Sequence, residues 1–185
     1  MGDKMNIKRI IVGDLECNCY ILEKDNSVLI IDPGDEFNKI FSNLKDKNLV
    51  GIIITHYHFD HIGALDELRN KYNVLVYDIN NMCEGENKIG NFNFDVIYTP
   101  GHKEDAITIY FKEENIMFTG DFLFKDSVGR CDLLGGNVLE MISSIEKIKK
   151  YDDSLVYPGH GEFTTLLYEI ENNIYFKDNS RLLKD

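Results

Sequence analysis

The chain has 185 residues, a formal net charge of -12 and a hydrophobic fraction of 43%. This hydrophobic fraction is enough for a buried core and excludes a disordered chain. The excess of acidic residues disfavours nucleic acids and anionic membrane surfaces as partners, because both attract clustered Lys and Arg. For this length we expect a single domain that spans residues 1–185.

Nine strands are predicted from short stretches that are rich in apolar, β-branched and aromatic residues. They cover residues 7–12, 19–23, 28–32, 50–55, 74–77, 92–99, 107–111, 116–119 and 154–157. Several of them contain continuous apolar runs, which are typical of strands that are covered on both faces. A layered α/β fold with two sheets inside and helices outside is therefore expected.

Four helices are predicted between these groups of strands, over residues 36–47, 61–72, 137–150 and 165–173. The third carries an apolar stripe at helical spacing, and Asn137 can cap its start. Residues 83–88 are expected to form a solvated turn. Residues 175–185 are polar and are expected to form a short tail or the end of a terminal helix.

The four cysteines, at positions 17, 19, 83 and 131, lack the spacing of a zinc knuckle or a thioredoxin-like site. We expect Cys17 and Cys19 to be small buried hydrophobic residues of one strand. The polar segment 1–9 lacks the apolar core of a signal peptide, and no apolar run is long enough to span a membrane. A reduced, cytoplasmic setting is therefore predicted.

All five histidines lie in three short segments that follow predicted strands. The first segment, 55–61, reads Thr-His-Tyr-His-Phe-Asp-His and contains His56, His58, Asp60 and His61. The other two are Pro-Gly-His turns, which contain His102 and His160. Asp121 follows another strand in the same way. This arrangement brings every candidate to one edge of the sheets, where loops carry function.

Imidazole nitrogens and carboxylate oxygens are ligands that suit zinc, iron and manganese. Four such ligands in one short turn are too many for a single catalytic ion with open positions. We therefore expect two ions, one bound by His56 and His58 and the other by Asp60 and His61. The ligands that are still needed come from His102, His160 and a bridging Asp121.

These segments resemble the metallo-β-lactamase superfold, specifically its short glyoxalase II-like (hydroxyacylglutathione hydrolase-like) branch. The resemblance is carried by residues 18–20, 31–34, 55–63, 99–102, 118–121 and 158–161. It implies an αβ/βα four-layer sandwich in which helices flank two mixed β-sheets. It also implies a ligand set in which Asp121 bridges two ions, metal one being bound by His56, His58 and His102 and metal two by Asp60, His61 and His160.

Further features bear on the branch of this family. Asp121 stands where β-lactamases of the commonest subclass carry Cys, which argues against antibiotic hydrolysis. Residues 127–133 resemble the Gly-Arg-x-Asp loop of short glyoxalase II-like proteins and of persulfide dioxygenases. In this loop Arg130 can pair with Asp132 or bind a substrate carboxylate. Residues 103–106 depart from the family's Thr-x-Gly-Ser pattern, and the C-terminal helical domain of full-length glyoxalase II is expected to be absent.

The resemblance implies a metal-dependent hydrolase of a small-molecule substrate, in which a metal-bound hydroxide attacks a thioester or ester carbonyl. Two divalent ions are expected, with zinc favoured and iron or manganese as alternatives. Asp60 is the catalytic candidate, because it can orient the hydroxide while it binds metal two. Tyr57 and Phe59 alternate with the ligands, so they are expected to point away from the ions and to pack.

Three other functions are retained as alternatives. An oxygenase similar to persulfide dioxygenases would use one iron, bound by His56, His102 and Asp121. A nuclease of the same superfold is disfavoured by the acidic charge. A metal-binding protein without turnover is disfavoured because all seven ligand positions are filled. No oligomeric state is predicted.

Overall fold

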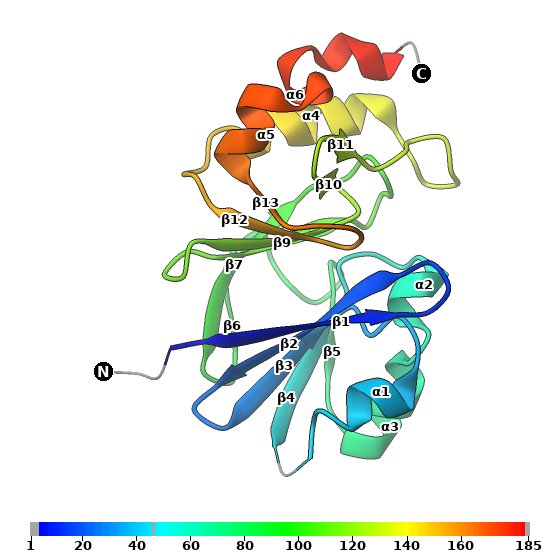
Figure 1. Ribbon diagram of the computed structural model, residues 1–185, viewed down its shortest axis with the longest axis vertical. Coiled ribbons are helices and arrows are strands. Elements are labelled where there is room, and N and C mark those ends of the chain that lie inside the picture. Colours follow the sequence, from blue (N-terminus) through cyan, green and yellow to red (C-terminus); the bar gives the residue numbers. More distant parts are fainter. Residues whose placement is uncertain (1–3, 46, 184–185) are drawn as a thin grey trace.

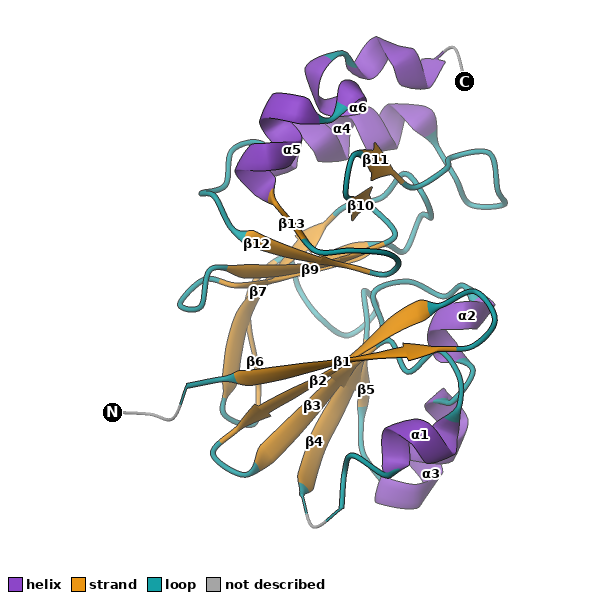
Figure 2. Cartoon of the chain, in the orientation of Figure 1, coloured by secondary structure: helices purple, strands orange, loops and turns teal. Residues whose placement is uncertain are grey.

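Two β-sheets pack face to face at the centre of the molecule, and helices cover their outer faces (Figure 1). The computed structural model describes residues 4–45 and 47–183. The N-terminal half of the chain supplies one sheet with its helices, and the C-terminal half supplies the other. The layers therefore follow the order helices, sheet, sheet, helices, and the predicted αβ/βα four-layer sandwich is confirmed (Figure 2).

The first sheet has five strands in the order β1-β2-β3-β4-β5. Their bounds are Asn6–Val12, Cys17–Lys24, Ser27–Ile31, Asn48–Ile53 and Val76–Tyr77. Strands β1, β2 and β3 pair antiparallel, whereas β4 and β5 add in parallel. The helices of this half are α1, α2 and α3, with bounds Phe37–Phe41, Phe59–Ile62 and Leu65–Tyr72.

The second sheet has six strands in the order β13-β12-β9-β8-β7-β6. In chain order from β6 their bounds are Gly85–Ile89, Phe92–Tyr98, Ile107–Phe111, Ile116–Gly120, Leu155–Pro158 and Thr164–Thr165. Only the β9–β12 pair of this sheet is parallel among the described residues. A small hairpin, β10 (Leu123–Phe124) with β11 (Ser127–Val128), follows β9.

The helices of the C-terminal half cover the outer face of the second sheet. They are α4 (Val138–Ile148), α5 (Leu166–Asn172), α6 (Ile174–Lys177) and a 3-10 turn, η1 (Asn179–Leu183). The side chain of Asn137 accepts hydrogen bonds from the backbone N–H groups of Leu139 and Glu140, so the predicted cap of α4 is confirmed. Three residues of its apolar stripe are fully buried, Met141, Ile145 and Ile148.

Alternation along the buried strands explains why their sequences are continuously apolar. On β3, Leu29 and Ile31 face the core between the two sheets. Val28 and Ile30 point the other way and pack against Ile40 of α1 and other residues of the first helical layer. Both faces of the strand are therefore covered, as the apolar runs predicted.

Two predicted helices differ in detail. The helix expected over 61–72 is split into α2 and α3, because the N–H groups of Gly63 and Ala64 donate to the carbonyls of Gly34 and Pro33 (2.7 and 3.0 Å). A Cβ on Gly63 would lie 2.2 Å from the Gly34 oxygen, so only glycine permits this approach. Helix α1 ends at Phe41 instead of residue 47.

The prediction of a solvated turn over 83–88 was wrong. Residues from Gly85 onward form β6, whose polar sequence pairs with β7 through the full length of the strand. Long-range pairing thus overrides a weak local strand preference. Near the C-terminus, Phe176 and Leu182 are buried, so the expected end of a terminal helix is docked on the core, while residues 184–185 lie outside the described residues. None of the described helices is long and apolar enough to cross a membrane.

Candidate metal centre

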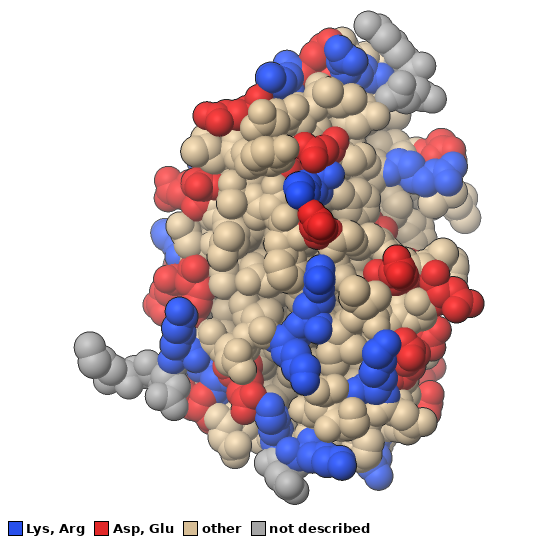
Figure 3. Space-filling model, viewed as in Figure 1, with Lys and Arg blue, Asp and Glu red and all other residues tan. Residues whose placement is uncertain are grey.

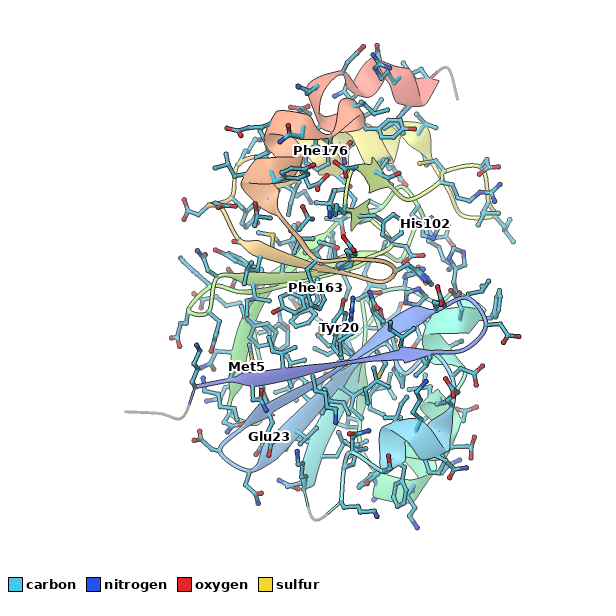
Figure 4. The ribbon with its side chains drawn as sticks, in the orientation of Figure 1. Met5, Tyr20, Glu23, His102, Phe163 and Phe176 are labelled. Carbon is cyan, nitrogen blue, oxygen red and sulfur yellow. The ribbon has the colours of Figure 1, made fainter. Side chains whose placement is uncertain are left out.

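Seven side chains that were predicted to bind metal meet at one edge of the sandwich. They lie on turns that follow β4, β7, β9 and β12, and on the short helix α2. Figure 4 shows one of them, His102, at the boundary between the two halves of the molecule. The centre is therefore assembled from both sheets, and its residues are His56, His58, Asp60, His61, His102, Asp121 and His160.

Three imidazoles form the first group. Nδ1 of His58 lies 3.0 Å from Nε2 of His56 and 2.9 Å from Nε2 of His102. A tetrahedral zinc ion with Zn–N bonds of about 2.0–2.1 Å holds its nitrogens roughly 3.3 Å apart. The three nitrogens thus converge at close to the separation that one bound ion requires.

The second group combines imidazole and carboxylate. Nε2 of His160 lies 3.2 Å from Oδ2 of Asp60, and Nε2 of His61 lies 3.8 Å from the same oxygen. Asp121 stands between the two groups. Its Oδ1 is 3.3 Å from Nε2 of His61, and its Oδ2 is 3.5 Å from Nε2 of His102. This placement is the one that a ligand shared by two ions needs.

Four of the imidazoles have an acceptor at their outward nitrogen. Nδ1 of His61 lies 2.9 Å from Oδ2 of Asp32, and Nδ1 of His56 lies 3.2 Å from the hydroxyl of Thr55. Backbone carbonyls serve the other two. Nδ1 of His102 lies 2.8 Å from the Arg130 oxygen, and Nδ1 of His160 lies 2.9 Å from the Leu15 oxygen. A proton held on Nδ1 leaves the Nε2 lone pair free to face the centre.

Sequence reasoning did not assign a role to these outer partners. The carbonyls of Arg130 and Leu15 belong to the backbone, so their side chains carry no signal of the contact. Asp32 offered a signal, because a charged residue stands at the end of the apolar strand β3. The structure shows this buried carboxylate with φ +50, accepting hydrogen bonds from the backbone N–H and the hydroxyl of Thr55 (2.8 and 2.6 Å).

Opposing electrostatic effects act on the titrating groups of the centre. Burial alone would raise the pKa of Asp60, but the hydrogen bond from His160 and the charge of His61 lower it to about 2. Burial likewise opposes the raised pKa of His61, which the charge of Asp32 and the nearby carboxylate of Asp121 impose. His56 is farther from the carboxylates, with its Nε2 3.9 Å from Oδ2 of Asp121, and burial followed by the charges of the neighbouring imidazoles lowers its pKa. The carboxylate side of the centre therefore favours positive charge.

Two buried atoms of the centre have no hydrogen-bond partner within the described part of the chain. They are Nε2 of His61 and Oδ1 of Asp121, 3.3 Å apart. Leaving a buried polar atom unpaired costs about 1–3 kcal/mol. A cation between the two atoms would satisfy both, because each has a lone pair. The donor set and its unpaired atoms thus fit divalent metal ions.

The approach to the centre is close at Gly159, in the turn before His160. A Cβ at this position would lie 2.2 Å from Oδ1 of Asp121 and 2.8 Å from Cε1 of His61. No residue with a side chain can occupy that space without displacing one of them. Residue 159 of this Pro-Gly-His turn is therefore glycine for a direct steric reason.

The side chains around the centre differ partly from expectation. Phe59 is 74% exposed, so the prediction that it packs was wrong. Tyr57 does turn away from the imidazoles, and its hydroxyl donates to Oδ2 of Asp78 at 2.6 Å. Arg130 pairs with Asp132 through two hydrogen bonds of 2.6 Å, which is the ion-pair alternative for this loop. Both of these charged side chains are exposed.

Comparison with known proteins identifies the family of this centre. The model of the "Metallo-beta-lactamase superfamily" matches residues 12–79 and 84–160, which is most of the chain. The chain belongs to the metallo-β-lactamase superfamily. The superfamily is one of metallo-hydrolases, and the predicted resemblance to it is confirmed.

Two relatives within the superfamily match nearly end to end. "Probable metallo-hydrolase YqgX" of Bacillus subtilis is 35% identical, over 91% of this chain and 96% of its own length. "Hydroxyacylglutathione hydrolase GloC" of Haemophilus influenzae is 29% identical, over 95% of this chain and all of its own length (100%).

Two solved structures show the same superfamily architecture. The "BLEG-1 B3 metallo-beta-lactamase" is 31% identical with a TM-score of 0.87, over 92% of this chain and 99% of that one. "TTHA1623 in a di-iron-bound form" is 29% identical with a TM-score of 0.83, over 91% of this chain and 99% of that one.

Proposed function

We propose that this chain is a dinuclear metal-dependent hydrolase that cleaves a thioester or ester bond of a small acyl substrate, as glyoxalase II-like enzymes do. The observation that carries the proposal is the position of Asp121 between two groups of ligand atoms. One ion would be held by His56, His58 and His102. The other would be held by Asp60, His61 and His160, with Asp121 shared by both.

The comparisons support this choice among the reactions of the superfamily. GloC is a hydroxyacylglutathione hydrolase by name and matches along its whole length. TTHA1623 has been solved with two irons, so the proposal allows iron as well as zinc or manganese. The chain would act as one domain, since the described parts of both halves share the core between the sheets. Its four cysteines are free, which suits the reducing cytoplasm.

Bound divalent ions lower the pKa of water and polarise a carbonyl oxygen. The chain's own residues would orient the reactants. The pKa of about 2 keeps Asp60 ionised at neutral pH, so its carboxylate can accept a hydrogen bond from the attacking water. This hydrogen bond would orient the water so that one of its lone pairs points at the acyl carbon. His160, 3.2 Å from Oδ2 of Asp60, fixes the direction of that carboxylate. Burial of His56 and His61 keeps competing water away from the inner side of the centre.

A mononuclear iron oxygenase is the second candidate, because the Arg130–Asp132 loop resembles that of persulfide dioxygenases as well. That centre would use His56, His102 and Asp121 and leave His58 free. In the structure Nδ1 of His58 lies within 3.0 Å of both other imidazoles, which supports its use as a ligand. A nuclease gains no support, since basic and acidic side chains are interspersed on the face seen in Figure 3.

Metal analysis combined with a substrate panel tests the proposal. The purified protein should contain two ions per chain and hydrolyse thioesters, with S-lactoylglutathione assayed first and a β-lactam included because of the similarity to BLEG-1. A chelator should abolish hydrolysis, and added zinc should restore it. One iron per chain with oxygen consumption on a persulfide would select the oxygenase. Hydrolysis that survives complete metal removal would overturn the mechanism.

A further inference from the structure

The turn that carries His160 belongs to the second sheet but is held by the first. It spans residues 159–163, between β12 and β13. Strand β2 reaches it through the backbone. The N–H of Asn18 donates to the Gly159 oxygen at 2.7 Å, and Cys17 forms an isolated antiparallel bridge with His160. The position of His160 is thus set by contacts that cross from one half of the molecule to the other.

Side chains of the first sheet fasten the same turn. Nδ2 of Asn18 donates to the oxygens of Pro158 and Gly161, at 3.0 and 3.1 Å. The hydroxyl of Tyr20 donates to the Pro158 oxygen at 2.6 Å. These donors hold the inner side of the turn, where they are buried.

Arg9 fastens the outer side. It is an exposed residue of β1, the edge strand of the first sheet. Its Nη1 donates to the Gly161 oxygen at 3.0 Å, and its Cζ lies 4.5 Å from the centre of the Phe163 ring. Phe163 lies beside Tyr20 where the two halves meet (Figure 4), and its ring centre is 4.4 Å from that of Tyr157. One guanidinium therefore contacts both ends of the segment 161–163.

The turn needs such contacts because glycine at position 161 leaves its backbone free to adopt several conformations. Gly161 has φ +75, a conformation that glycine adopts at little cost, and nothing lies within 4 Å of the position that its Cβ would take. A Cβ at this position would therefore gain no packing contact with the described residues. Its carbonyl oxygen is held by Asn18 and Arg9 together.

We propose that Arg9 is a positioning residue for His160, which it holds through the Gly161 carbonyl and the Phe163 ring, and that the ion bound by Asp60, His61 and His160 depends on it. This inference rests on the proposed two-ion centre. The planar guanidinium suits the role, because it can donate in its plane and stack on an aromatic face at once. A lysine at this position retains the charge over the ring but loses the fixed geometry of the donor.

The test measures zinc affinity of the full chain by competition with a chelator. The His160→Ala variant first identifies which of the two ions depends on His160. Arg9→Ala should then lower the affinity for that ion about tenfold, which is the lower end of the range for loss of an outer partner of a ligand. The affinity for the other ion should not change. Arg9→Lys should restore part of the affinity. Phe163→Leu, which retains the Arg9–Gly161 hydrogen bond, should weaken the same ion less than Arg9→Ala does.

Lys8→Ala is the matched control, since Lys8 is the neighbouring exposed cation of β1 and its ammonium donates to Asn43 instead. It should bind both ions as the unmodified chain does. The inference is overturned if Arg9→Ala binds both ions with unchanged affinity, or weakens both equally with a lower thermal midpoint. An unmodified chain that binds fewer than two ions overturns the two-ion centre itself, so the two failures are distinguishable.

Discussion

Asp32 and His61 are 29 positions apart in the sequence, and Oδ2 of Asp32 lies 2.9 Å from Nδ1 of His61 in the structure. The same carboxylate accepts two hydrogen bonds from Thr55, the residue that precedes His56. One buried side chain therefore connects the end of β3 to both groups of ligand atoms. Outer contacts of this kind fix the tautomer and the direction of a ligating imidazole.

Replacement of Asp32 by Asn should lower the affinity for the ion bound by His61. The amide can present its N–H₂ group to Nδ1 and so favour the wrong tautomer, and it has only one oxygen for the two donors of Thr55. We expect affinity for that ion to fall about 10–100-fold and the free energy of unfolding to fall by about 1–3 kcal/mol. Chelator competition and denaturant titration measure the two effects.

Asp35→Asn is the control for this variant, because Asp35 is exposed in the same turn and its carboxylate accepts only a local hydrogen bond from the Glu36 N–H among the contacts of the described chain. It should leave both ions in place. Unchanged zinc affinity in Asp32→Asn would contradict a positioning role for this carboxylate.

The ligand candidates could be predicted because each stands directly after an apolar strand. Strand ends meet at one edge of a sheet, so residue types and spacing were enough to place the candidates His102, Asp121 and His160 at that edge. What holds these residues could not be predicted. The carbonyl of Arg130 contacts His102 whatever side chain residue 130 carries. The exposure of Phe59 also escaped prediction, because it follows from how α2 begins and not from alternation along a strand.

The fold was predictable for a similar reason, and the elements that were predicted wrongly have specific causes. Continuous apolar runs locate the strands that are covered on both faces, such as β3. Strand β6 has only Ile89 as a buried residue and depends on pairing with β7 along the whole of its length. The break between α2 and α3 depends on carbonyls of the Pro33–Gly34 turn, about 30 residues earlier in the chain. Local sequence patterns do not contain either contact.

Replacement of His58 by Ala should separate the dinuclear hydrolase from the mononuclear oxygenase. If His58 is a ligand, the variant should lose the ion that it shares with His56 and His102, and kcat/KM for the thioester should fall at least about 100-fold. Tyr57→Phe is the control, because the change leaves the ring and removes only the hydroxyl bound to Asp78. One iron per chain in both the unmodified protein and His58→Ala, with oxygen consumption on a persulfide retained by the variant, would favour the single-iron centre.

Tyr57 should also contribute to the pH dependence of stability in the alkaline range. Burial, then the hydrogen bond to Asp78, raise the pKa of Tyr57 to about 12 in the folded chain, against about 10 in an unfolded one. The folded state thus holds this proton more tightly. The resulting stabilisation is complete below about pH 10 and is lost as the pH rises toward 12. Because Tyr57 is partly exposed, solvent will reduce the effect.

Denaturant titrations of the unmodified chain and of Tyr57→Phe measure this contribution. The stability difference between the two should be constant from neutral pH to about pH 10 and should shrink above it. A difference that stays constant through pH 12 would contradict the raised pKa.

Replacement of Gly159 by Ala should damage the centre through sterics alone. The added Cβ would lie 2.2 Å from Oδ1 of Asp121, so the carboxylate, the turn or both must shift. Displacement of a reacting or ligating group by about 1 Å costs roughly 100-fold in rate, and overpacking costs about 1–3 kcal/mol of stability. We therefore expect loss of the ion near His61 and a fall in kcat/KM of at least about 100-fold.

Gly135→Ala provides the comparison for a general glycine effect. Gly135 has φ +86 and would meet Lys103 and Glu104 only at ordinary contact distances, 3.5 Å or more. Alanine there carries backbone strain of about 1–2 kcal/mol but leaves the ligands in place. This variant should lose stability and retain both ions, as metal analysis and thermal unfolding would show. If Gly159→Ala also retains both ions and full activity, Asp121 has room to move and is not held in the shared position between the two ligand groups.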